Sequence, residues 1–128
     1  MIELSAVFVD QVATPRKAPI EQPIDVKHLA RMTLGDASLE REVLQLYDRQ
    51  AEMLLARMCQ AGTNAAGYAH TLKGSSGGIG AWRVARAAEA VEAAAGSGGP
   101  ADVAAAIGAL AAAIGEARLV IADLLRAH

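Results

Sequence analysis

One histidine of this 128-residue sequence stands among residue types suited to phosphoryl chemistry. His70 is followed by Lys73 and Gly74, which lie three and four positions further on and share its side of a helix. Neutral imidazole is a competent nucleophile, and a lysine ammonium within its reach suits an anionic group such as a phosphoryl. These residues are the parts of a phosphohistidine site. The competing interpretation is an incidental surface histidine beside a solvated helix charge.

Glycines accompany the histidine along the same side of the helix. Gly74 and Gly77 lie four and seven positions after His70, although a glycine inside a helix costs roughly 0.5–1 kcal/mol relative to alanine. Access offers a reason, because another backbone can approach the imidazole closely only where no Cβ intervenes. We therefore predict that Gly74 and Gly77 form a docking surface for a partner. For Gly77 the alternative, a helix end followed by a turn, remains equally open.

Helical periodicity sets the positions of these residues. Asp25 can cap a short helix that ends near Gly35, and Asp36 or Ser38 can cap a second that ends at Gly62. Thr63 or Asn64 begins a third, a fourth starts near Ala81, and the Gly96–Pro100 break precedes the last. The apolar positions recur at helical spacing: Leu39, Val43, Leu46, Met53, Leu54 and Met58; then Ala65, Ala69, Leu72, Ser76 and Ile79; then Val84, Ala88, Val91 and Ala95; then Val103, Ile107, Leu110, Ile114, Ala117, Ile121 and Leu124.

These elements predict an all-α protein. Hydrophobic residues make up 53% of the chain and aromatic residues only 3%, so the core is aliphatic. Short loops favour an antiparallel up-down-up-down four-helix bundle over residues 24–128, with a short leading helix. Residues 1–23, with three prolines, form an N-terminal tail that we expect to be poorly ordered, although Val7-Phe8-Val9 offers an apolar patch that could pack onto the bundle.

Charge and composition exclude several kinds of partner. The net charge is −2 and no basic patch is present, which argues against nucleic-acid binding. The single cysteine, Cys59, is interpreted as a small core residue, and no cysteine–histidine spacing indicates a zinc site. The uncharged apolar run from Val103 to Gly115 is shorter than the ~20 residues of a membrane span. We therefore predict no membrane partner and a cytoplasmic location.

The segment His70-Thr71-Leu72-Lys73-Gly74-Ser75-Ser76, followed by Ile79-Gly80-Ala81, resembles the signature of histidine-containing phosphotransfer (HPt) domains of bacterial two-component phosphorelays. The resemblance covers about residues 24–127, and its strong part is residues 69–81. It implies that His70 accepts a phosphoryl group on Nε2 and that Lys73 interacts with the phosphoryl oxygens. It also implies that Gly74 leaves room for a receiver domain.

The resemblance further implies a phosphorelay intermediate. Its partners would be response regulator receiver domains and a hybrid histidine kinase, and the protein would be a monomer. It would need no cofactor of its own, because Mg²⁺ is expected on the receiver. The sequence contains no P-loop motif, so phosphotransfer would depend on a partner. Two alternatives remain: a binding-only adaptor or inhibitor of a kinase or response regulator, and a purely structural bundle.

Overall fold

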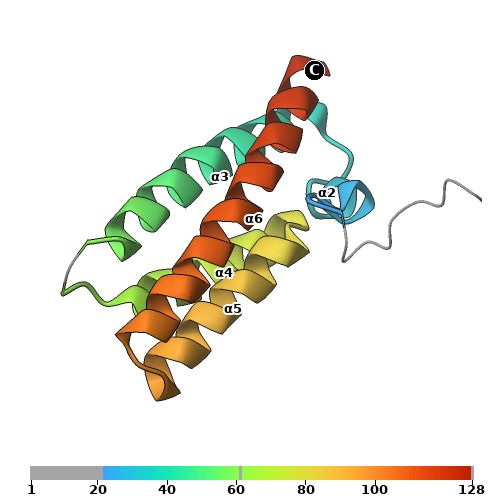
Figure 1. Ribbon diagram of the computed structural model, residues 1–128. Coiled ribbons are helices and arrows are strands. Elements are labelled where there is room, and N and C mark those ends of the chain that lie inside the picture. The colour runs from blue at the N-terminus through green and yellow to red at the C-terminus, as the bar shows by residue number, and fades with distance from the viewer. Residues whose placement is uncertain (1–21, 61, 128) are drawn as a thin grey trace, which may run out of the picture.

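The computed structural model describes residues 22–60 and 62–127, and within these ranges it contains helices and no strand. The helices are α2 (Val26–Met32), α3 (Ala37–Met58), α4 (Ala65–Ile79), α5 (Trp82–Ser97) and α6 (Pro100–Ala127), as Figure 1 shows. The all-α prediction is confirmed. Most of the predicted N-terminal tail, residues 1–21, lies outside the described residues.

Polar caps begin three of these helices where the sequence offered them. The side chain of Asp25 accepts a hydrogen bond from the backbone N–H of His28 at 3.2 Å. Asp36, and not Ser38, caps α3, and Asn64, and not Thr63, caps α4. Each cap satisfies a backbone donor that the first helical turn leaves without an intrahelical partner.

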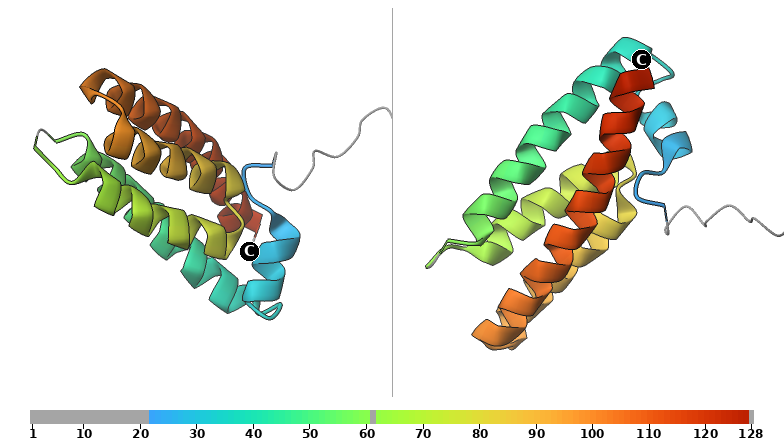
Figure 2. Two further views of the ribbon diagram at one scale, coloured as in Figure 1. Left: turned by 90° about the horizontal axis from the view of Figure 1, so that it is seen from below. Right: turned by 45° about the horizontal axis from the view of Figure 1, so that its top comes forward.

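The four long helices lie side by side. α3 contacts α4 and α6, and α5 contacts the same two helices, so each long helix has two neighbours. In the left view of Figure 2, α5 and α6 form one layer and α3 and α4 the other. The short helix α2 packs against α4. This arrangement buries one face of α4 and leaves the opposite face to solvent.

The predicted core face of α4 is confirmed, whereas that of α3 is partly wrong. Ala69, Leu72 and Ser76 are fully buried. On α3, Leu39, Leu46 and Met53 are exposed, and the buried residues are Leu44, Tyr47, Ala51, Leu54 and Met58. The reason is that α3 carries two adjacent apolar stripes, and only one of them can face α4 and α6. Ala95 is also exposed, because it lies in the last turns of α5, close to the loop before α6.

Helix α6 differs from the expectation based on its uncharged run. Its 28 residues are long and apolar enough to cross a membrane by length and composition alone. Leu110, Ile114 and Ile121 are nevertheless buried in the hydrophobic core. Arg118 also forms an ion pair with Asp48 of α3, with 2.7 Å between Nε and Oδ1. These contacts pack α6 against α3 and α5.

A tight turn sets the register between α4 and α5. Gly80 follows α4 with φ 82°, a left-handed conformation that favours glycine. Its carbonyl accepts a hydrogen bond from the backbone N–H of Asp25 at 2.8 Å. A Cβ on Gly80 would lie 2.8 Å from the backbone oxygen of Asp25. The turn therefore joins α4, α5 and the start of α2.

Candidate functional site

His70 projects from the solvent side of α4, as its spacing predicts. The core residues Ala69 and Leu72 point inward, and 71% of the His70 side chain is exposed. Since α4 continues unbroken from Ala65 to Ile79, the imidazole is fixed to a rigid element. A reagent or a partner can reach it directly from solvent.

One carboxylate from α5 contacts two side chains of α4. Oε2 of Glu92 lies 3.0 Å from Nδ1 of His70, and Oε1 lies 2.9 Å from Nζ of Lys73. Because a carboxylate is an acceptor, Nδ1 carries the proton in this bond. The lone pair of the neutral ring is then on Nε2, and Nε2 is the nitrogen able to react.

The Glu92 carboxylate and the Lys73 ammonium stabilise each other's charged forms. The bond from Lys73, assisted by that from His70, lowers the pKa of the Glu92 carboxyl below its usual value. The same carboxylate raises the pKa of the Lys73 ammonium. Near neutral pH the site therefore presents a charged pair, the Lys73 ammonium and the Glu92 carboxylate, beside the ring of His70.

Glu89 and Glu92 both lie on α5, and the structure distinguishes them as partners for His70. Glu92 makes the contact, whereas Glu89 acts on Lys73 only through its charge. The sequence positions of His70 and Glu92 relative to the α4–α5 turn also indicate this pairing. Gly80 and Ala81 join α4 to α5, and His70 and Glu92 each lie eleven positions from Ala81, so two helices that double back at this turn bring the pair together.

The two predicted docking glycines have different surroundings. A Cβ on Gly74 would meet no atom within 4 Å, so this position is open, one turn beyond His70. A Cβ on Gly77 would lie 3.7 Å from the Trp82 ring. The carbonyl of Gly77 also accepts a hydrogen bond from Nε2 of His28 at 3.1 Å. Gly77 thus lies against neighbouring side chains, and Gly74 provides the open surface.

His28 and Arg83 have partners of their own. His28 donates a hydrogen bond to the Gly77 carbonyl, and its ring lies 4.8 Å from the Trp82 ring, centroid to centroid. Arg83 pairs with Glu116 of α6 at 3.1 Å. The prediction that Cys59 is a core residue is wrong: it caps the end of α3 and is exposed. In the part of the chain that the structure describes, no group of three or more His, Cys, Asp or Glu side chains could hold a metal ion.

Comparison with known proteins identifies the family of this chain. The family model of the Hpt domain matches residues 42–120, more than half of the chain. The chain belongs to the Hpt domain family. The matched range includes His70, Lys73 and Gly74 as well as Glu92. Hpt domains carry out histidine phosphotransfer in phosphorelays, and their partners are kinases and receiver domains.

A solved structure supports the Hpt fold. A histidine-containing phosphotransfer protein from rice matches this Hpt domain protein with a TM-score of 0.70 and 16% sequence identity. The match covers 97% of this chain and 89% of the rice chain. A search of curated proteins gave no significant match. At 16% sequence identity, the match to the rice structure supports the fold and nothing further.

Proposed function

We propose that this Hpt domain protein is a phosphorelay intermediate that accepts a phosphoryl group on His70 from a receiver-domain aspartyl phosphate and passes it to another receiver. The observation that carries the proposal is the pairing of an exposed His70 with Glu92 through Nδ1. This pairing directs Nε2 toward solvent, where a phosphorylated aspartate can approach.

The reaction follows from this orientation. The lone pair of Nε2 attacks phosphorus in line with the bond to the aspartyl oxygen. A nitrogen–phosphorus bond forms, the oxygen–phosphorus bond breaks, and the receiver's aspartate leaves as a carboxylate. Charge spreads over the phosphoryl oxygens during transfer, so positioning and electrostatic stabilisation supply most of the catalysis. Lys73, one turn from His70, supplies the nearby positive charge.

After transfer, Glu92 has a second role. The proton on Nδ1 gives the phosphorylated ring a positive charge, and the Glu92 carboxylate stabilises that charge. The return reaction to a second receiver uses the same geometry in reverse. Mg²⁺ and the acidic pocket that binds it belong to the receiver in this scheme, and the Hpt domain protein brings the imidazole and the ammonium.

The proposal also covers the helix arrangement, the oligomeric state, the location and the partners of the protein. The short α4–α5 and α5–α6 connections support an antiparallel up-down-up-down form of the fold. We further propose a monomer in the cytoplasm that serves response regulator receiver domains and a hybrid histidine kinase. Gly74 provides the clearance for the receiver.

The test uses two phosphoryl donors. The full-length protein is incubated with a receiver domain carrying ³²P on its aspartate and, separately, with phosphoramidate, a small donor that needs no docking surface. We expect acid-labile, alkali-stable label on the wild type and none on His70→Gln. The control His28→Gln removes another histidine and should still accept the label.

Each donor answers a different question. Equal labelling of wild type and His70→Gln would refute the assignment of the acceptor. Labelling by phosphoramidate without labelling by any receiver would leave His70 reactive but contradict the relay. Tight binding of a receiver without any phosphoryl transfer would favour the adaptor or inhibitor instead.

A further inference from the structure

The ammonium of Lys73 is already engaged in the unphosphorylated protein. Its Nζ lies 2.9 Å from Oε1 of Glu92, and 35% of the lysine side chain is exposed. The other carboxylate oxygen, Oε2, lies 3.0 Å from Nδ1 of His70, whose side chain is 71% exposed. The lysine therefore contacts the same group that contacts the histidine ring, and it is the less exposed of these two side chains of α4.

The two oxygens of Glu92 have different surroundings. Oε1 is buried from solvent, and among the described residues no hydrogen bond reaches it besides its ion pair with Lys73. A buried carboxylate oxygen without a partner is costly, so a carboxylate in this place needs the ammonium. The contact with Lys73 is also the largest cause of the lowered pKa of the Glu92 carboxyl. Lys73 thus keeps Glu92 both ionised and in place.

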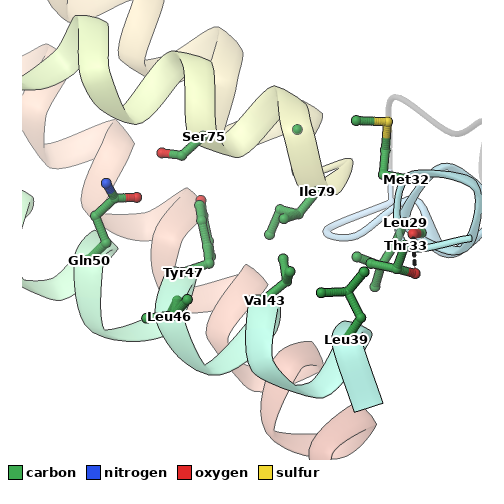
Figure 3. A pocket seen from close by; sticks show the side chains of 11 residues that line it. Leu29, Met32, Thr33, Leu39, Val43, Leu46, Tyr47, Gln50, Ser75 and Ile79 are labelled. Carbon is green, nitrogen blue, oxygen red and sulfur yellow. Dashed lines mark hydrogen bonds between the residues drawn. The ribbon is translucent and has the colours of Figure 1, made fainter. Parts of the chain in front are cut away.

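The surroundings of α4 offer Lys73 no stronger acidic partner than Glu92. Glu89, one turn before Glu92 on α5, acts on the lysine only through its charge. On the flank of α4 that faces α2 and α3, eleven described residues line an open groove, among them Leu46 and Ser75, and none of the eleven is acidic (Figure 3). Within the part of the chain that the structure describes, Glu92 is therefore the carboxylate that fixes Lys73.

The position of Glu92 decides which nitrogen of the His70 ring can react. A neutral imidazole exchanges between two tautomers, and the hydrogen bond at one nitrogen selects the position of the proton. With the carboxylate at Nδ1, that nitrogen carries the proton and Nε2 keeps its lone pair. A glutamate side chain has several rotatable bonds, so a carboxylate released from Lys73 can turn toward water. Loss of the ammonium would then remove the acceptor for Nδ1–H.

We propose that Lys73 is a positioning residue, whose ammonium holds the Glu92 carboxylate against Nδ1 of His70 and thereby selects the tautomer with a free lone pair on Nε2. This role is exerted before any phosphoryl group arrives, and it differs from a direct contact between Lys73 and phosphoryl oxygens. The effect on the tautomer stands by itself, whereas the effect on phosphoryl transfer rests on the proposed function.

The first test measures the tautomer of His70 in the full-length protein by ¹⁵N NMR, with no phosphoryl donor present. At about pH 8.5 an ordinary imidazole is neutral and a lysine is charged, and comparison with His70→Gln identifies the His70 signals. We expect Lys73→Met to lower the ratio of the Nδ1–H to the Nε2–H tautomer by about tenfold, the scale of losing one hydrogen bond to a charged group.

Two further variants serve as controls for this measurement. Lys73→Arg keeps a cation beside Glu92 and should restore most of the tautomer ratio. Lys27→Met removes an exposed lysine on α2 and should leave the ratio as in wild type. An unchanged ratio in Lys73→Met would overturn the proposal.

A double-mutant cycle tests the same inference through the rate of phosphorylation. With phosphoramidate as donor, Lys73→Met and Glu92→Ala should each slow the labelling of His70 about tenfold, and the double variant should be no slower than Glu92→Ala. A double variant about a hundredfold slower than wild type would show that the lysine acts independently of Glu92, by contacting the phosphoryl group itself, and would overturn the proposal.

The two measurements separate the positioning role from the proposed function. If no donor labels the wild type while the tautomer ratio still falls in Lys73→Met, the positioning holds and the phosphorelay function fails. If His70 accepts label and the tautomer ratio is the same in Lys73→Met and wild type, the function holds and the positioning fails.

Discussion

Nδ1 of His70 on α4 lies 3.0 Å from Oε2 of Glu92 on α5, and the other oxygen of the same carboxylate lies 2.9 Å from Nζ of Lys73. One carboxylate thus contacts both the His70 imidazole and the Lys73 ammonium. The relationship crosses two helices, so its geometry depends on the Gly80–Ala81 turn between them. It also distinguishes the two ring nitrogens: Nδ1 contacts Glu92, and Nε2 is the nitrogen that the proposed transfer uses.

Replacing Glu92 tests the orientation of the ring. Glu92→Ala removes the acceptor for Nδ1–H, and we expect transfer from a phosphorylated receiver to slow about tenfold, equivalent to roughly 1.4 kcal/mol in the barrier. Glu92→Gln keeps an oxygen acceptor and should retain more of the rate than Glu92→Ala. Rapid-quench transfer kinetics measure both variants. Wild-type rates in Glu92→Ala would show that the contact does not orient the nucleophile.

Filling the open position at Gly74 tests the steric role of the glycine. Gly74→Leu meets no atom within 4 Å at its Cβ, so the variant should fold with a free energy of unfolding equal to wild type or higher by roughly 0.5–1 kcal/mol. Transfer from a receiver should nevertheless fall, because the new side chain blocks close approach. Phosphoramidate, a small donor, should be much less affected.

Gly115 supplies the matched control for that variant. It is another helical glycine with nothing within 4 Å, on α6 and far from His70 in the sequence. Gly115→Leu should gain similar stability in urea unfolding and keep the wild-type transfer rate. If both leucine variants transfer at the wild-type rate, close approach at Gly74 is not required.

Changing Gly80 should damage the fold. Gly80→Ala forces a side chain into a φ of 82° and places Cβ 2.8 Å from the backbone oxygen of Asp25. We expect the free energy of unfolding to drop by about 1–3 kcal/mol. Gly96→Ala, whose Cβ meets nothing within 4 Å, should be neutral or slightly stabilising. Urea unfolding of the two variants provides the comparison, and equal stability would show that the turn tolerates a side chain.

The buried Tyr47 predicts how stability changes at high pH. Burial raises its pKa from 10.0 to about 12, although the hydrogen bond with Ser76, 2.7 Å between the two oxygens, acts in the opposite direction. Since the folded state favours the neutral phenol, this contribution is fully present below about pH 10 and is lost as pH rises through about 12. The loss amounts to roughly 2–3 kcal/mol.

The comparison with Tyr47→Phe isolates that contribution. The phenylalanine variant has no phenol to ionise, so its urea-unfolding free energy should fall less between about pH 9 and pH 12 than that of the wild type. The two proteins share every other ionisable group, so the difference between their curves removes the effect of those groups. Parallel curves would contradict a raised pKa at Tyr47.

The sequence by itself determined the features that depend on local helical geometry. The spacing of Ala69, Leu72 and Ser76 requires that His70 face outward, and the burial of these three residues confirms it. Asp36 and Asn64 could be foreseen as caps because a cap contacts only the next few residues of its own chain. The all-α class followed from periodicity over whole helices.

Only the tertiary structure decided the features that depend on which helix faces which. Leu46 and Tyr47 lie on adjacent apolar stripes of α3, and packing against α4 and α6 buries Tyr47 and exposes Leu46. Glu92 and Glu89 are equivalent as residue types, and the register of α5 against α4 selects Glu92 as the partner of His70. Helical periodicity predicts which residues share a face of a helix. Which other helix packs against that face depends on long-range contacts, and the spacing within one helix does not encode them. The outward position of His70 could therefore be read from the sequence, whereas the carboxylate that contacts its ring could not.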